Sequence, residues 1–324
     1  MTDTIPGIHH VTAIASDPQR NVDFYTEVLG LRLVKQTVNF DDPQTYHLYY
    51  GDELGHPGTI LTFFPFEGTQ SGRVGPGQVS ATAFVVPEGS ADYWLDRLRE
   101  FEAEFDLSIS GTEQRFGETV VRFSDYDGQP LELVESGRND DIDPWTDGPV
   151  PTEHAIRGFH GVTLDSSDFE GTKTVLETLG YEKESEGDEG DRTRYRAASD
   201  RACVVDLRDA SNDPRGLQGA GTVHHVAFRT PDDESQLAWR ERLTEEGLRV
   251  TEVKDRQYFR SIYFREPGGV LFEIATDPPG FTRDEEPAEL GSSLKLPPWL
   301  EDDRERLQRG LANIDVSRAM EADR

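Results

Sequence analysis

Ile5-Pro6-Gly7-Ile8-His9-His10-Val11-Thr12-Ala13-Ile14, near the start of the chain, has the apolar and small residues typical of a half-buried strand. Similar stretches recur at Val79–Val86, Ile156–Leu164 and Thr222–Phe228. They follow one another at intervals of about 60 to 80 residues, and self-similarity at such a period indicates one structural unit that is repeated along the chain. The sequence therefore predicts four copies of this unit.

Each copy continues with an amphipathic stretch and closes with a second apolar strand. The amphipathic stretches predict helices at Pro18–Leu29, Ala91–Glu104, Glu170–Leu179 and Glu234–Glu246. The closing strands are expected at Thr59–Phe64, Gln129–Glu135, Cys203–Leu207 and Gly269–Ala275. We expect an α+β fold of four βαβββ modules, in which a strand is followed by a helix and three further strands.

The segment Ser136–Glu153 has the proline and aspartate content of a linker. It separates an N-terminal half, residues 1–150 with modules one and two, from a C-terminal half, residues 151–290 with modules three and four. Residues 291–324 form a tail. In this tail, Trp299 is expected to pack on the body as an aromatic anchor, and Arg304–Leu311 is expected to form a final helix.

Acidic residues far outnumber basic ones: 63 Asp and Glu against 33 Lys and Arg give a net charge of −30. The excess is spread over the whole chain, which resembles halophilic proteins from cells with molar salt, where screening over about 3 Å removes self-repulsion. A polyanion lacks the cations that neutralise phosphates, so we expect no nucleic acid partner.

No apolar run approaches the roughly 20 residues of a membrane span, and no basic region followed by an apolar one opens the chain. We expect a cytoplasmic protein with no membrane partner, and a homo-oligomer is left open. Cys203 has no second cysteine to pair with. Its apolar neighbours favour a strand position facing a core over a catalytic thiol.

Four segments carry a resemblance to a known family: Gly7–Thr12, Tyr46–Asp52, Pro57–Pro65 and Asp255–Arg265. With the four βαβββ modules, they resemble the vicinal oxygen chelate superfamily and, within it, the ring-cleaving dioxygenases that act on hydroquinones. The resemblance covers about residues 5–280. It implies two domains of curled mixed sheets around a metal, Fe(II) or alternatively Mn(II). It also implies O2 and a small aromatic substrate, a hydroquinone or a catechol, as partners.

Two pairs of adjacent histidines stand in opening strands, His9 with His10 and His224 with His225, and Glu273 stands in a closing strand. Neighbouring strand residues point to opposite faces, so one histidine of each pair can face the concave side. The resemblance assigns His10, His225 and Glu273 as ligands, the facial triad of non-haem Fe(II). A lone strand histidine is more often a buried structural residue, but two pairs at equivalent positions favour a metal site.

The resemblance also suggests four catalytic residues: His224 as an acid or base, Thr12 near a metal-bound oxygen, Arg256 to hold negative charge, and Tyr263 to donate a hydrogen bond or a proton. Arg256 and Tyr263 are expected in the two strands before the glutamate strand. Ordinary structural roles stay open for each of them. For His9 a spacer role is preferred, and His47, His56 and His154 receive no metal role.

The metal is expected between modules one and four. Aligned with Glu273 are Glu132 in module two and Thr62 in module one, whereas Ala81 and Gly161 stand where a histidine ligand is needed. Modules two and three are therefore expected to form a structural copy without a metal. A register slip of one residue would turn His160 inward in place of His10.

Two other functions stay open at this point. A glyoxalase-like isomerase or a thiol transferase would use a metal without O2, but glyoxalases generally have a fourth protein ligand where this chain has Thr62. A sequestering protein of the drug-resistance type would use the same cleft without a metal, and would not require His10, His225 and Glu273 to face inward.

Overall fold

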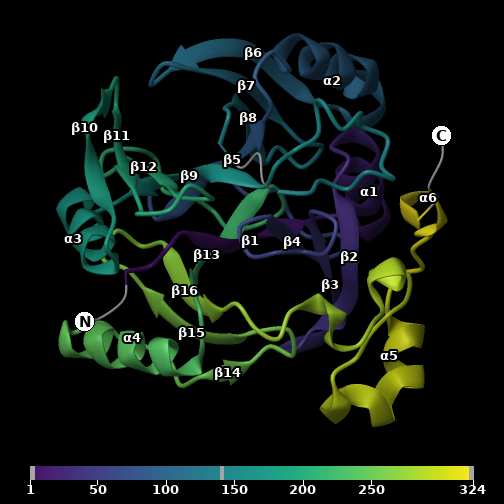
Figure 1. Cartoon of the computed structure of the whole chain (residues 1–324). Coiled ribbons are helices and arrows are strands. Elements are labelled where there is room, and N and C mark those ends of the chain that lie inside the picture. The colour runs from purple at the N-terminus through teal and green to yellow at the C-terminus, as the bar shows by residue number, and fades with distance from the viewer. Residues whose placement is uncertain (1–3, 139–141, 321–324) are drawn as a thin grey trace.

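The computed structural model describes residues 4–138 and 142–320, so residues 139–141 of the expected linker lie outside it. The predicted α+β fold of four βαβββ modules is confirmed (Figure 1). In order, the modules comprise β1 (Ile8–Ala15), α1 (Pro18–Asp23), β2 (Arg32–Asn39), β3 (Asp42–Gly51) and β4 (Ile60–Pro65); β5 (Gln78–Val86), α2 (Ala91–Phe105), β6 (Ser108–Arg115), β7 (Glu118–Ser124) and β8 (Pro130–Glu135); β9 (Phe159–Ser166), α3 (Phe169–Leu179), β10 (Glu182–Glu189), β11 (Arg192–Arg196) and β12 (Val204–Asp209); and β13 (Thr222–Thr230), α4 (Asp233–Glu245), β14 (Lys254–Asp255), β15 (Arg260–Arg265) and β16 (Leu271–Thr276).

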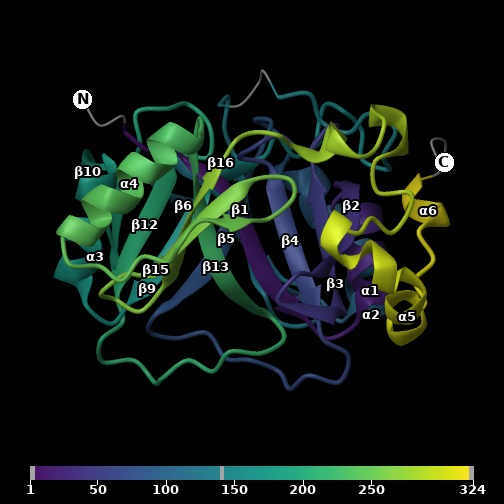
Figure 2. The same ribbon diagram turned by 90° about the horizontal axis from the view of Figure 1, so that it is seen from below.

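The strands form two curled eight-stranded sheets. One has the order β14-β15-β16-β13-β1-β4-β3-β2, and the other has the order β10-β11-β12-β9-β5-β8-β7-β6. The first sheet thus joins module one to module four through the antiparallel pair β1 and β13, and the second joins module two to module three through β5 and β9. Strands that are more than two hundred residues apart in the chain lie side by side at the centre of the first sheet (Figure 2).

The first helix shows how local sequence sets an element. Asp17 caps α1 because its carboxylate accepts from the backbone N–H of Arg20, and Pro18 fits the first turn, where no N–H donor is needed. The expected single helix then widens into a π-helix, η1 (Phe24–Val28). The wider turn places Tyr25 in the core, where its hydroxyl donates to Asp125 at 2.8 Å.

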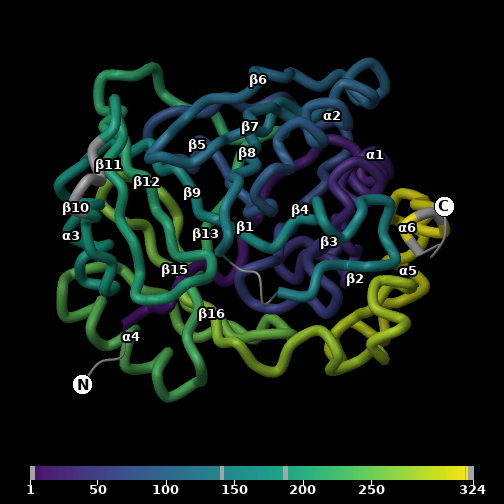
Figure 3. The backbone as a smooth tube through the Cα atoms, turned by 45° about the horizontal axis from the view of Figure 1, so that its top comes forward, coloured from purple at the N-terminus to yellow at the C-terminus, as the bar shows by residue number. Residues whose placement is uncertain are grey.

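The tail lies along the edge of module one, where α5 (Arg304–Gly310) contacts β3 and α6 (Ser317–Met320) contacts α1 and η1 (Figure 3). The expected final helix is present as α5 (Arg304–Gly310). The Trp299 ring packs edge-to-face on Phe40 of module one, with ring centroids 5.6 Å apart, but it is 51% exposed and therefore little buried as an anchor. Leu296 and Leu307 pack on the sheet instead, because their side chains reach buried Val38.

The structure also bears on Cys203 and on the length of the apolar helices. Cys203 is buried as expected, but it lies one residue before β12 rather than inside a strand. Among the residues that the structure describes, no helix is both long and apolar enough to cross a membrane.

Candidate metal centre

Three neighbouring strands, β1, β13 and β16, bring the candidate ligands together. His10 lies in β1, His225 in β13 and Glu273 in β16, and β13 pairs with both of the other strands. The register places Thr12 opposite His225 and Ala227 opposite Glu273. Residues two apart share a face of a strand, so His10, His225 and Glu273 all point to the concave side of the first sheet.

The three donor atoms are separated by distances that suit one small divalent ion. His10 Nε2 lies 3.3 Å from His225 Nε2 and 3.4 Å from Glu273 Oε2, and His225 Nε2 lies 2.9 Å from Glu273 Oε2. With ligand bonds of about 2.1 Å, donors at right angles lie about 3.0 Å apart, and donors at the tetrahedral angle about 3.4 Å apart. The residues therefore fit a divalent metal held on one face.

Glu273 has the protonation state that a ligand needs. Its Oε1 accepts a short hydrogen bond from Ser261, whereas Oε2 is buried and makes no hydrogen bond of acceptable geometry within the described part of the chain. Burial acts to raise the pKa of Glu273, but the His10 and His225 imidazoles outweigh it and hold the pKa well below its usual value. Burial lowers the pKa of His225, so the site combines a carboxylate with a neutral imidazole.

Each candidate ligand histidine is held by the histidine beside it in the chain. His10 Nδ1 lies 2.9 Å from His9 Nδ1, and His225 Nδ1 lies 2.8 Å from His224 Nδ1. If Nε2 of each candidate ligand binds a metal, its Nδ1 carries the proton. The Nδ1–H then donates a hydrogen bond to the neighbouring histidine, which fixes the orientation of the ring. His9 is buried against Phe259, so the expected spacer role for His9 was wrong.

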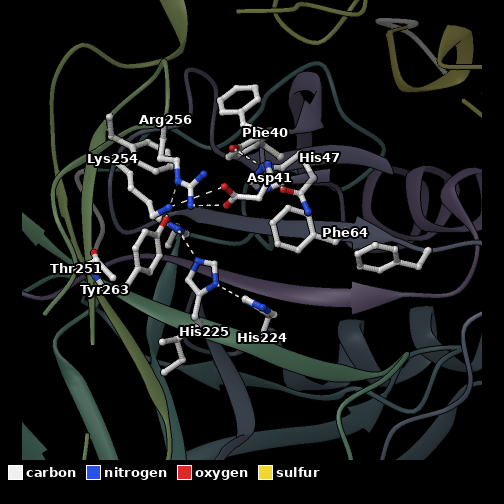
Figure 4. A pocket seen from close by; sticks show the side chains of 16 residues that line it. Phe40, Asp41, His47, Phe64, His224, His225, Thr251, Lys254, Arg256 and Tyr263 are labelled. Atoms are coloured by element: carbon white, nitrogen blue, oxygen red, sulfur yellow. Dashed lines mark hydrogen bonds and ion pairs between the residues drawn. The ribbon is translucent and has the colours of Figure 1, made fainter. Parts of the chain in front are cut away.

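A cavity of about 310 Å³ opens above the ligands (Figure 4). Its wall is largely aromatic, with Phe40, Phe64, Phe66 and Phe259. Cavities of this size and character bind small organic molecules. His224 also lines it, and burial, followed by the effect of His225, lowers the pKa of His224 to about 3, so its imidazole is uncharged at neutral pH.

Arg256 and Tyr263 form one side of this cavity. Tyr263 lies in β15, but Arg256 lies one residue after β14 and not inside a strand as expected. Arg256 Nε donates to the Tyr263 hydroxyl oxygen at 3.0 Å, and its Nη2 donates to Asp41 of module one at 2.9 Å. Burial, followed by the nearby Glu273 carboxylate, raises the pKa of Tyr263, so the phenol stays protonated. Its O–H is therefore available as a donor.

His47 also lines the cavity, although no metal role is expected for it from the sequence. Its Nε2 lies 2.6 Å from Thr62 Oγ1, and its Nδ1 lies 2.7 Å from the Tyr49 hydroxyl. Thr62, which the resemblance aligns with a fourth ligand of glyoxalases, donates to Thr12 at 3.2 Å. The alternation of His47 and Tyr49 in one strand was the signal that could have placed both on the same face.

The second sheet fills the equivalent place with ion pairs. Glu132 is buried between the guanidinium groups of Arg115 and Arg192, and His160 lies 3.1 Å from Glu118. At Gly161 a Cβ would lie 2.2 Å from the Val204 carbonyl oxygen, so no histidine fits there. His10, His225 and Glu273 make the one group of three metal-ligand side chains found across residues 4–138 and 142–320.

The remaining histidines are engaged elsewhere. His56 Nδ1 lies 2.7 Å from Asp52, and His154 stacks on Tyr93 and lies 3.0 Å from Ser90 Oγ. Neither contacts the candidate ligands.

Comparison with known families matches the Glyoxalase/Bleomycin resistance protein/Dioxygenase superfamily over residues 7–133 and 176–274. The chain belongs to this superfamily. Within the superfamily it is 50% identical to "Putative ring-cleaving dioxygenase MhqO" of Bacillus subtilis strain 168, over 96% of this chain and 97% of that protein. It is 36% identical to the "Chlorohydroquinone/hydroquinone 1,2-dioxygenase" of Sphingobium indicum, over 95% of this chain and 97% of that protein.

Solved structures of superfamily members show the same architecture. The crystal structure of a "putative dioxygenase" from Bacillus subtilis is 49% identical, covers 98% of this chain and 99% of its own, and superposes with a TM-score of 0.91. Glyoxalase I from Zea mays is 16% identical, covers 84% of this chain and 92% of its own, and has a TM-score of 0.60, which shows a shared fold alone.

Proposed function

We propose that this chain is a ring-cleaving dioxygenase that uses Fe(II), with Mn(II) as the alternative metal, to open a hydroquinone-type or catechol-type ring with O2. One observation carries the proposal: two buried histidines and a buried glutamate converge at the base of an aromatic-lined cavity. Two relatives, which are named as a ring-cleaving dioxygenase and a hydroquinone dioxygenase, support it. An iron held by His10, His225 and Glu273 would bring the ring and O2 together and carry electrons from one to the other.

The cavity walls would bind the substrate and hold it in place. Phe64 and Phe259 offer ring faces and edges to a flat aromatic molecule, and such pairs prefer offset or edge-to-face contact. The ligands lie at the base of this apolar space, so a substrate that fills the cavity would exclude water from them.

Arg256 and Tyr263 would stabilise negative charge on a ring oxygen. Because Arg256 Nε donates to the Tyr263 oxygen, the Tyr263 proton remains free to donate into the cavity. The guanidinium charge makes that phenol a stronger donor and adds its own attraction to an ionised hydroxyl. His224 would act beside them. Because His224 Nδ1 accepts a hydrogen bond from His225, its proton is on Nε2, and this N–H would donate to the substrate.

Oxygen uptake tests this function directly. Protein reconstituted anaerobically with Fe(II) and then given air and hydroquinone should consume O2 and form a ring-opened product that absorbs in the near ultraviolet. Catechol and substituted dihydroxybenzenes define the ring that is accepted. If none of them causes O2 consumption by iron-loaded protein, the proposed function is wrong.

A further inference from the structure

A row of polar side chains crosses the concave face of the first sheet toward the candidate ligands. Tyr49 of β3 lies opposite Thr62 of β4, Thr62 lies opposite Thr12 of β1, and Thr12 lies opposite His225 of β13. Directly opposed residues of neighbouring strands point to the same face. Thr12 therefore lies between Thr62 and a candidate metal ligand.

His47 closes this row into a continuous chain of hydrogen bonds. Its imidazole joins the Tyr49 hydroxyl, at 2.7 Å from Nδ1, to the Thr62 hydroxyl, at 2.6 Å from Nε2. Thr62 then reaches Thr12 at 3.2 Å. Tyr49, Thr62 and Thr12 are almost entirely buried and His47 is half-buried, so little water competes for these bonds.

The number of protons sets the direction of the chain. Each hydroxyl has one proton, and a neutral imidazole has one N–H. If Tyr49 donates to His47 Nδ1, then His47 Nε2–H donates to Thr62 and Thr62 donates to Thr12, so every proton in the chain except that of Thr12 is used. In the reverse direction, the buried Tyr49 proton has no acceptor among the described residues, because its hydroxyl has only the bond to His47. An unpaired buried donor is costly, which favours the first direction.

We propose that His47 is a positioning residue that, held by Tyr49 and acting through Thr62, aims the Thr12 hydroxyl proton into the cavity. Thr12 accepts from Thr62, so its own proton is left to donate to an oxygen of the substrate or of O2 beside His225. The role of that donor rests on the proposed dioxygenase function. The direction of the chain itself rests only on the residues.

Kinetics of matched variants separate positioning from packing. His47→Phe keeps an aromatic wall next to Phe64 but removes the donor to Thr62, and Thr62→Val removes the central hydroxyl at nearly equal volume. Each is expected to lower kcat for hydroquinone about 10- to 100-fold, the usual effect of losing such a supporting group, with KM and iron content little changed. His47→Gln and Thr62→Ser, which keep the donors, should recover most of kcat. Thr82→Val, at an equally buried threonine of the second sheet, is the control and should match the wild type.

A double-mutant cycle tests whether His47 acts through Thr12. In a Thr12→Val background, His47→Phe and Thr62→Val should cause no further loss of kcat, because their shared target is already removed. Full additivity of the losses, or wild-type kcat in His47→Phe, would overturn the proposal.

A measurement without turnover keeps this inference distinct from the dioxygenase function. In 15N-histidine-labelled protein free of paramagnetic metal, the His47 signals, assigned with His47→Gln, should show protonated Nε2 and bare Nδ1. Tyr49→Phe should remove this preference. An Nδ1–H tautomer for His47 would refute the chain direction even if the enzyme cleaves rings, whereas an inactive wild type with the Nε2–H tautomer would refute the dioxygenase and leave the direction intact.

Discussion

Replacing one histidine in each sheet tests which pair of modules holds the metal. His10→Ala removes a donor that lies 3.3 Å from His225 Nε2 and 3.4 Å from Glu273 Oε2. His160→Ala is the matched control, because His160 is also buried in the first strand of a module and also lies beside a glutamate. Metal binding is expected to fail in the first variant and to persist in the second.

The expected loss of metal affinity follows from the contribution of one ligand to the free energy of metal binding. Structural zinc sites with four ligands bind with about 10 to 16 kcal/mol, so one ligand contributes about 2.5 to 4 kcal/mol. A loss of that size weakens Kd about 100- to 1,000-fold. The variant should still fold, because Glu273 keeps its hydrogen bond from Ser261 and the space left by the ring only enlarges the cavity that His10 already lines.

The assay combines metal analysis with a titration. Protein reconstituted anaerobically with Fe(II) is desalted and its iron is measured by mass spectrometry, and Mn(II) affinity is measured by calorimetry. Thermal unfolding confirms that both variants are folded at the assay temperature. If His10→Ala binds Mn(II) as tightly as the wild type, or if His160→Ala loses the metal, the assignment of ligands to modules one and four is wrong.

Three further outcomes are expected. Tyr263→Phe should lower kcat about 10- to 100-fold with unchanged iron content, because a donor to a charged oxygen contributes about 1.5 to 3 kcal/mol; unchanged oxygen uptake would contradict its role. Burial acts to raise the pKa of Glu118, but His160 and Arg194 outweigh it and lower the pKa from 4.5 to about 2. This shift corresponds to at most about 3 kcal/mol of folding stability. That stability is present above pH 4.5 and is lost as the pH falls toward 2. Glu118→Gln should therefore be less stable at neutral pH, and its free energy of unfolding, measured with denaturant, should depend less on pH in the acid range. An unchanged pH dependence would exclude this ion pair. Below about 0.1 M salt, the net charge of −30 should lower Tm relative to molar KCl, and equal values in both buffers would argue against a salt-adapted surface.

Local pattern determined the four modules and much of the candidate site. Strand and helix periodicity repeats along the chain, so βαβββ order could be predicted without tertiary contacts. Strand alternation left one histidine of each pair on the concave face, and the resemblance to the superfamily selected His10 and His225 from the two pairs. Gly161 and Thr62 were also informative because neither was expected to supply a metal ligand. Gly161 argued against a metal in modules two and three, and Thr62 argued against a fourth protein ligand.

Only the tertiary structure decided how the remaining polar groups are connected. The chain from Tyr49 through His47 to Thr12 depends on the register of β3, β4 and β1, which is fixed by long-range pairing. The same holds for Arg256, whose contact with Asp41 joins residues 215 positions apart, and for the tail, where Leu296 rather than Trp299 is buried. A strand pattern specifies which face a side chain occupies. Its neighbours on that face are set by which strands lie alongside, and that depends on packing of the whole chain.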